Sequence, residues 1–268
     1  MTIEVLISTM NIENNIEYKK LINKMKIKSN SITINQCPNM QKLIDDNLSG
    51  PNKLMSFKDK GLSKSRNLAI KNASSDICVL ADDDVDYYEN YEKIINDAYK
   101  KYPDADIIAF YVNSLNKDRP ITAQKEGRIH FLKSLKISSI QITFKRNSIK
   151  EANISFDEHF GAGSGIFMSG EENIFLTDCL KKNLKIYYVN KTIANVSNED
   201  STWFKGFTEE YFETIGACYY RMSKFLHHIL YAQYAIRKYK YYKNNVSLIN
   251  AFKRMYIGKK KYKKLDVI

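Results

Sequence analysis

The chain has 268 residues, of which 44% are hydrophobic and 12% aromatic. This is enough apolar material for the core of one medium domain with or without an appendage, and it excludes intrinsic disorder for most of the chain. The net charge of +12 is typical of a nucleic-acid-binding protein, but residues 221–268 hold 13 of the 42 Lys and Arg and only one of the 30 Asp and Glu. The body is therefore neutral, and the excess charge belongs to a C-terminal tail.

The N-terminal sequence gives no sign of export. MTIEVLISTMN has no basic segment before a long apolar run, so we expect a cytoplasmic protein. No stretch reaches the roughly 18 to 20 apolar residues of a spanning helix, so any membrane attachment is expected to be peripheral. The cysteines are scattered without a paired spacing, and we expect four buried free thiols: Cys37, Cys78, Cys179 and Cys218.

Hydrophobic periodicity predicts alternating strands and helices. Apolar runs predict strands at 3–8, from 32 on, at 76–81, 106–112, 138–144 and 184–189. Helical spacing predicts helices at 15–25, from an N-cap at Ser63 to about Ala73, and at 87–102, 171–182, 208–230 and 246–256, with a frayed end over Lys259 to Lys264. This order predicts an α/β fold, with a mostly parallel sheet flanked by helices and ligands bound beyond the carboxyl ends of the strands.

Three adjacent carboxylates end the strand 76–81. Asp82, Asp83 and Asp84 repel one another unless a cation lies among them, and if the chain stays extended Asp82 and Asp84 point the same way. Oxygen ligands suit Mg²⁺ or Mn²⁺, and magnesium sites commonly use one or two carboxylates plus substrate phosphates. The alternative is that one aspartate caps the next helix, which does not account for three in a row.

The segment GLSKSRNLAIKNASSDICVLADDDV resembles the signature of family 2 glycosyltransferases. The later FDEHFGAGSGIFMSGEENIFL is similar to that family's acceptor-side loop and "GED" motif, and the resemblance covers about residues 3–205. It implies a GT-A fold, a nucleotide-sugar-binding, Rossmann-like mixed sheet, over residues 1–205. Residues 206–268 would then form a helical, basic C-terminal extension.

The resemblance also implies roles for single residues. Asp82 and Asp84 would hold Mn²⁺ or Mg²⁺. Nucleotide-sugar contacts are implied for Ser8, Thr9, Asn11, Gln36, Lys60, Arg66, Asp82 and Asp83. Gln36 occupies the position where the family often has an aspartate that recognises uracil. Without the resemblance, Arg66 is equally well explained as an exposed helix charge.

Glu172 aligns with the family's general base, and Glu171 is the alternative. A base of this kind takes the proton of the acceptor hydroxyl during an inverting transfer. Read without the resemblance, both are first-turn carboxylates favoured by the helix dipole. Many relatives have a further metal-ligating histidine after the last strand. This chain has none there, so either Asn195, Asn198, Glu199 or water replaces it, or metal binding is weaker than in the family. His159 and Trp203 are further candidates for substrate contact.

Residues 221–268 interleave Lys and Arg with seven tyrosines. An anionic membrane surface is the expected partner of this tail, whereas nucleic acid, a homo-oligomer contact and a merely solvated face are the alternatives. We expect a metal-dependent, inverting transferase that moves one sugar from a nucleotide sugar, UDP-linked, to a hydroxyl of a surface glycan or lipid-linked glycan. The alternatives are a nucleotide-sugar-binding protein without catalysis and a nucleic-acid-binding protein.

Overall fold

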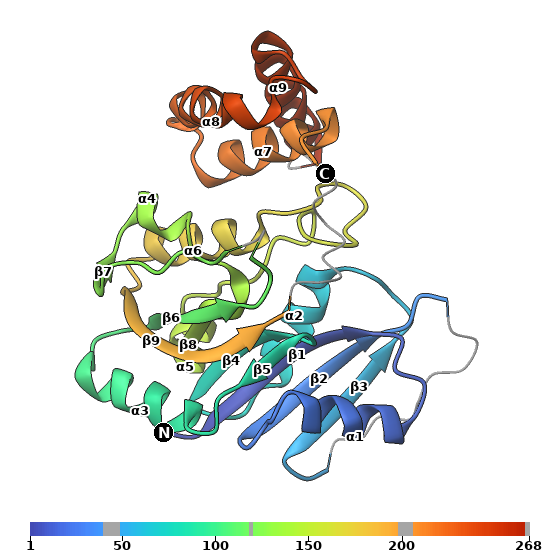
Figure 1. The fold of residues 1–268 in the computed structure, drawn as a ribbon, viewed down its shortest axis with the longest axis vertical. Coiled ribbons are helices and arrows are strands. Elements are labelled where there is room, and N and C mark those ends of the chain that lie inside the picture. Colours follow the sequence, from blue (N-terminus) through green and yellow to red (C-terminus); the bar gives the residue numbers. More distant parts are fainter. Residues whose placement is uncertain (40–48, 118–119, 198–205, 266–268) are drawn as a thin grey trace.

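A computed structural model describes residues 1–39, 49–117, 120–197 and 206–265. It shows a body built on one twisted sheet with helices against it, and a separate layer of helices at the C-terminal end of the chain (Figure 1). We call residues 1–197 the body and residues 206–265 the helical unit.

The nine strands described in the body form one mixed sheet, in the order β3-β2-β1-β4-β8-β6-β9-β5, with β7 also paired to β9. They are β1 (Ile3–Met10), β2 (Asn30–Gln36), β3 (Asn52–Phe57), β4 (Ile77–Asp82), β5 (Val85–Tyr87), β6 (Ile107–Ser114), β7 (Gly127–Ile129), β8 (Ile142–Lys145) and β9 (Ile186–Val196). The first half, β3-β2-β1-β4, is parallel. The antiparallel strand β8 joins it to the second half, so the sheet is mixed.

The helices described are α1 (Asn15–Lys24), α2 (Leu62–Asn72), α3 (Tyr91–Lys101), α4 (Phe131–Ser134), α5 (Arg146–Glu151) and α6 (Glu171–Lys181) in the body, and α7 (Glu209–Met222), α8 (His227–Tyr242) and α9 (Leu248–Leu265) in the helical unit. A short 3-10 turn, η1 (Ser139–Gln141), precedes β8. Within the described residues, no helix is both long enough and apolar enough to cross a membrane.

The core lies on both faces of the sheet. Alternate residues of β4 enter different clusters, with Ile77, Val79 and Ala81 on one face and Cys78 and Leu80 on the other. A strand covered on both faces reads as a continuous apolar run, as the sequence of β4 does. The four cysteines are free and buried, as predicted.

Two close backbone contacts hold the helical unit together. A β-carbon on Gly216 of α7 would lie 2.0 Å from the carbonyl oxygen of Met255, and one on Gly258 of α9 would lie 1.8 Å from the carbonyl oxygen of Glu213. Only glycine permits this approach. Helices α7 and α9 therefore cross at the distance that their two glycines allow.

The helical unit shares one hydrophobic cluster with the body. Phe160, Phe167 and Ile174 of the body pack with residues of α7 and with Tyr262 of α9. Arg221 of α7 adds ion pairs to Asp157 (3.0 Å) and Asp178 (2.7 Å) of the body. The two parts are thus joined by packing as well as by charge. The predicted boundary near residue 205 lies outside the described residues and stays a prediction.

Several predicted elements differ from the structure. The helix predicted over 208–230 is two helices, because Ser223 adopts an extended backbone and its hydroxyl accepts from the Leu226 N–H at 3.1 Å. The prediction of a frayed end over Lys259 to Lys264 is wrong, since α9 continues to Leu265 and Tyr262 is buried against Phe160 and Phe167.

The remaining differences are local. Gly61, not Ser63, occupies the N-cap position of α2, and the Ser63 hydroxyl instead donates to the carbonyl of Phe160 at 2.6 Å. The strand predicted over 138–144 begins only after η1. Strands β3, β5 and β7 were not predicted; β5 and β7 have three residues each, too few to show a period.

Candidate functional site

The first and fourth strands bring polar residues to one edge of the sheet. In the parallel pairing of β1 with β4, Ser8 lies opposite Asp82, and in the pairing of β1 with β2, Met10 lies opposite Gln36. Ser8 and Thr9 are buried, and their hydroxyls are engaged: Ser8 accepts from Ser65 of α2 at 2.8 Å, and Thr9 donates to Asp83 at 2.6 Å. The residues predicted at this edge therefore do lie together.

The acidic triplet is a turn between two strands. Strand β4 ends at Asp82, the chain turns at Asp83 and Asp84, and β5 begins at Val85. The condition under which Asp82 and Asp84 would point the same way, an extended chain through the triplet, is therefore not met. Burial raises the pKa of Asp83, and the negative charge of Asp82 raises it further, against the hydrogen bond from Thr9. Negative charge is crowded at this turn.

Arg66 links the two acidic motifs. Its guanidinium donates to Asp82 at 3.1 Å and to Glu171 at 2.9 Å, and also to the hydroxyl of Ser139 at 2.8 Å. Arg66 is 1% exposed, so its interpretation as an exposed helix charge is wrong. Its Nε has no hydrogen-bond partner among the described residues. One buried cation thus joins the end of β4 to the start of α6, across 105 residues of sequence in the case of Glu171.

Glu171 and Glu172 begin α6, after Gly170 in a left-handed conformation with φ of 98°. Glu171 is 6% exposed and paired with Arg66, whereas Glu172 is half-buried and receives a 3.3 Å hydrogen bond from Asn173. Loss of water contact and the neighbouring charge of Glu171 raise the pKa of Glu172 to about 8. The two carboxylates therefore differ, one neutralised by a fixed cation and one able to exchange a proton near neutral pH.

The glycine-rich loop before α6 packs closely on the site. A β-carbon on Gly161 would lie 3.3 Å from the Glu171 carboxyl carbon, and one on Gly163 would lie 2.7 Å from the side chain of Lys60. Asn67 of α2 fixes the start of this loop, because its amide donates to the carbonyl of Phe156 at 3.0 Å and accepts from the N–H of Phe156 at 2.8 Å. The exposed Lys60 therefore lies beside the loop rather than against Arg66.

The other predicted nucleotide contacts are placed as follows. Gln36 is buried, and its amide oxygen accepts from the N–H of Gly61 at 2.8 Å while its nitrogen donates to the carbonyl of Thr9 at 3.4 Å. Asn11 is exposed and left-handed, with φ of 57°, and its N–H donates to the carbonyl of Gln36. Gln36 therefore links the edge of the sheet to the start of α2, and its role toward a base stays a prediction.

The candidates for the missing histidine are largely untested. Asn198, Glu199 and Trp203 lie outside the described residues. The amide oxygen of Asn195 accepts from Tyr88 at 3.2 Å and from Asn113 at 3.0 Å. His159 lies 2.8 Å from a carboxylate oxygen of Asp157, away from the acidic turn in the hydrogen-bond network.

Three structural partners of the site were not predicted. Ser139 bonds to Arg66, Asn67 holds the loop, and Cys218 of α7 packs against Gly170, where a β-carbon would lie 2.6 Å from its sulfur. Asn67 had a detectable signal, because it follows Arg66 in the predicted motif. Ser139 and Cys218 had none, since each comes from a distant and unremarkable stretch of sequence.

The acidic turn fits a divalent cation only in part. Within the described ranges, no group of three or more His, Cys, Asp and Glu side chains is placed to hold a metal ion. One oxygen of Asp82 is bound to Arg66, but its side chain is 37% exposed and keeps a second oxygen. Since Mg²⁺ typically takes one or two carboxylates and completes its shell with phosphates and water, these residues fit a cation that arrives with a diphosphate.

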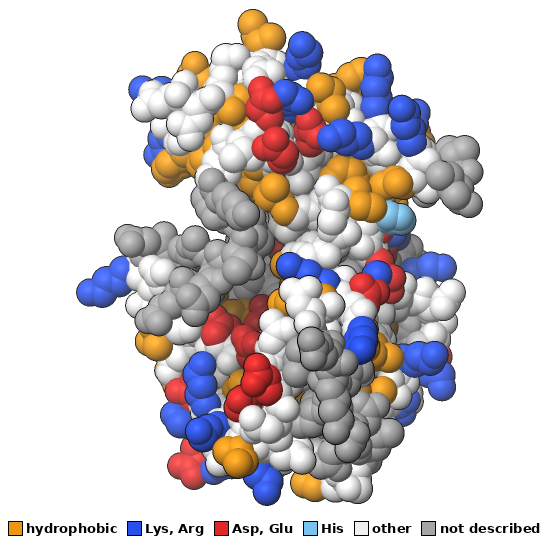
Figure 2. Space-filling model, turned by 90° about the vertical axis from the view of Figure 1, so that its right-hand side faces the viewer, with side chains coloured by type: hydrophobic (Ala, Val, Ile, Leu, Met, Phe, Trp, Pro, Cys, Tyr) orange, Lys and Arg blue, Asp and Glu red, His pale blue; other side chains and the backbone are white. Residues whose placement is uncertain are grey.

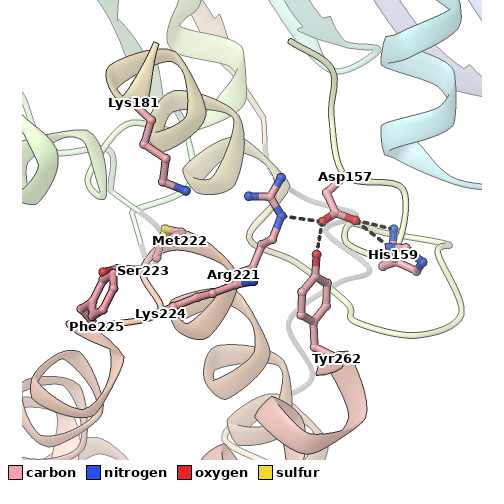
Figure 3. Close-up of a pocket in the computed structure, with 9 residues that line it drawn as sticks. All are labelled: Asp157, His159, Lys181, Arg221, Met222, Ser223, Lys224, Phe225 and Tyr262. Atoms are coloured by element: carbon pink, nitrogen blue, oxygen red, sulfur yellow. Dashed lines mark hydrogen bonds and ion pairs between the residues drawn. The ribbon is translucent and has the colours of Figure 1, made fainter. Parts of the chain in front are cut away.

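Figure 2 shows Asp and Glu side chains gathered beside a hollow between the body and the helical unit. A separate open pocket of about 500 Å³ lies at another part of this junction, with Asp157, His159, Arg221 and Tyr262 in its wall (Figure 3). Its polar groups bond mainly to one another: Asp157 accepts from Arg221 and from Tyr262, at 3.0 Å each. None of the predicted nucleotide-sugar or metal residues lines this pocket.

No known family model matches the sequence, and no curated protein matches it. Its fold is similar to solved structures of S. aureus TarS. Residues 1-349 of TarS match at a TM-score of 0.65 with 15% identity, over 96% of this chain and 81% of that one. TarS 1-349 in complex with UDP-GlcNAc matches at 0.65 with 14% identity over 96% and 81%, and its complex with UDP at 0.64 with 14% identity over 95% and 80%. At this identity the likeness shows the fold alone, and the predicted GT-A fold is confirmed.

Proposed function

We propose that the protein is a glycosyltransferase that moves one sugar from a UDP-linked donor to a hydroxyl of a surface glycan or lipid-linked glycan. The observation that carries the proposal is the link made by Arg66, which holds the acidic turn after β4 next to the two glutamates of α6. The fold supports it, because the matched TarS structures include complexes with UDP-GlcNAc and with UDP.

Glu172 is the proposed general base of an inverting transfer. With a pKa of about 8, a fraction of Glu172 is unprotonated at neutral pH, and that fraction can take the proton of the acceptor hydroxyl. Glu171 is the weaker candidate, since its carboxylate is buried and bound to Arg66. Glu171 and Arg66 therefore act as positioning residues that fix the first turn of α6, and Glu171 supplies the negative charge beside Glu172.

Asp82 and Asp84 are the proposed carboxylates for Mn²⁺ or Mg²⁺, together with the diphosphate of the donor. A bound cation of this kind supplies positive charge to the leaving diphosphate. Ser8, Thr9 and Gln36 shape the edge of the sheet, and their hydroxyl and amide groups are already engaged within the protein. Through these contacts they support the acidic turn and the start of α2.

The test is release of nucleoside diphosphate from a panel of nucleotide sugars, measured with Mn²⁺ and several glycan acceptors. We expect turnover of at least one UDP sugar, and a fall in kcat of about 10²- to 10⁴-fold in Glu172→Gln with donor affinity retained. Glu158→Gln, at an exposed carboxylate on the glycine-rich loop, keeps the side-chain oxygen that accepts from Asn67 at 3.0 Å, so it is the matched control and should keep its activity. Donor binding without turnover in the unchanged protein would instead establish a nucleotide-sugar-binding protein.

A further inference from the structure

Helix α8 is apolar on two opposite sides. Its inner side is buried against α7 and α9 through Leu230, Tyr231, Tyr234, Ala235 and Tyr242. Its other side carries exposed apolar residues: Phe225 (92% exposed), Leu226 (48%), Ile229 (65%) and Ile236 (65%). We call these four residues the outer face of α8. An apolar stripe along a helix is normally covered by other apolar groups, and the described structure covers only the inner side of α8.

The outer face is continuous. Ile229 and Ile236 are seven residues apart, about two helical turns, so they point the same way. Phe225 precedes Ile229 by four residues, at the turn that opens α8. Figure 1 shows α7 facing the body, with α8 on the outer side of the helical unit. The helix that carries Ile229 and Ile236 therefore lies away from the contact with the body, whereas Phe225, just before α8 begins, lies in the wall of the pocket at that junction (Figure 3).

Cations surround this face. The sequence has no Asp or Glu between Glu213 and Asp266, and Arg237, Lys240 and Lys243 are exposed on α8 or just beyond it. In the described part of the chain, none of these three has a carboxylate within ion-pair distance. The neighbouring helix α9 differs, because its Arg254 and Lys261 pair with Glu213 of α7. The charge beside the outer face is thus left for an external partner.

We propose that the outer face of α8 docks the protein onto an anionic lipid surface. Such a surface offers acyl chains to the four apolar side chains and phosphate to the cations around them. Exposed Tyr239, three residues after Ile236, flanks the face and suits the headgroup level. A second copy of the chain would bring like charges together across this face. Nucleic acid would use the cations and leave the apolar residues in water.

The test is flotation of the full-length protein with vesicles of phosphatidylcholine and phosphatidylglycerol in equal parts, compared with phosphatidylcholine alone. We expect flotation with the anionic vesicles, weakened by raising the salt concentration, and little with the neutral ones. Ile229→Gln with Ile236→Gln should lower the partition coefficient at least tenfold. Arg237→Gln with Lys240→Gln should lower it at least tenfold as well.

The matched control is Ile16→Gln, which alters a 68% exposed isoleucine on α1 of the body and should leave flotation unchanged. Equal flotation of both double variants and the unchanged protein would overturn the proposal, as would absence of flotation with anionic vesicles. A dimer in light scattering that Ile229→Gln with Ile236→Gln dissociates would identify a self-contact instead. Sugar transfer does not enter this readout, so the proposal stands or falls apart from the enzymatic one.

Discussion

At the scale of single residues, the site depends on one buried cation. Arg66 is 1% exposed and bonds to carboxylates of Asp82 and Glu171. Burying these charges costs free energy that is recovered only while both partners are present. The Glu171 side chain is 7% exposed, whereas that of Asp82 is 37% exposed, so Glu171 is the partner that would be left in the less solvated position without Arg66.

Replacing Arg66 should expose this dependence. We expect Arg66→Met to lower the free energy of unfolding by about 3 to 5 kcal/mol, because Glu171 is left buried without a partner. Arg66→Met with Glu171→Gln should cost less than the sum of the two single changes. Urea denaturation of the four proteins measures the coupling. If the free-energy costs of the two single changes add up to the cost of the double change, Arg66 and Glu171 do not stabilise the protein through their contact with each other.

The raised pKa of Glu172 leads to a prediction for the pH dependence of turnover. A base must be unprotonated, so kcat/KM should rise with pH and level off above an apparent pKa of about 8. The folded-state pKa is raised, so the folded protein holds a proton that the unfolded chain releases, and stability should fall as pH rises from about 4.3 to 8. Glu172→Gln should remove that part of the slope, which thermal unfolding across the same range measures. An unchanged slope would contradict the shift.

At the scale of elements, strand β4 was predictable and the helix contacts were not. The run from Ile77 to Ala81 shows its burial in its own composition, and the triplet after it marks the edge of the sheet. The partners of Arg66 are 16 and 105 residues away, and no local pattern identifies them. The prediction of a frayed end for α9 is wrong for the same reason. Its lysines look like a solvated terminus, whereas Tyr262 anchors it in the body.

The crossing of α7 and α9 gives an element-scale prediction. Gly216→Ala or Gly258→Ala places a methyl group within about 2 Å of a backbone carbonyl, so the helices must separate. We expect each change to cost about 1 to 3 kcal/mol. Gln233→Ala, at an exposed position of α8, is the control and should stay within about 0.5 kcal/mol. Melting temperatures by circular dichroism measure all three, and an alanine variant as stable as the control would show a looser crossing.

At the scale of the whole molecule, the helical unit is packed onto the body as part of one folded protein. It shares a hydrophobic cluster with the body, and Arg221 bonds to Asp157 and Asp178 across the junction. Burial raises the pKa of Asp157, but hydrogen bonds from His159 and Tyr262 and the charge of Arg221 outweigh it and hold the pKa below its usual range. The stabilisation that the ionised Asp157 gives to the folded protein is therefore present near neutral pH and is lost as the pH falls through that lowered pKa.

Breaking this junction should destabilise the protein as a unit. Arg221→Met leaves Asp178 with Lys181 alone and Asp157 with His159 and Tyr262, and we expect a loss of about 1 to 3 kcal/mol in the free energy of unfolding at pH 7. Arg237→Met, which removes an exposed arginine of α8, should cost less than about 0.5 kcal/mol. Urea unfolding followed by fluorescence measures both. A small effect of Arg221→Met would mean that packing alone holds the junction.

The contact between Cys218 and Gly170 offers a way to follow movement of the helical unit relative to the body. Burial raises the pKa of the Cys218 thiol well above its ordinary value, and the charges of Glu172 and Glu171 add to that effect, so the group is unreactive while α7 stays in place. Lifting α7 from the body would uncover this sulfur beside the first turn of α6. The rate at which a thiol reagent labels Cys218 therefore measures how often α7 moves away from the candidate base, in the absence of any substrate.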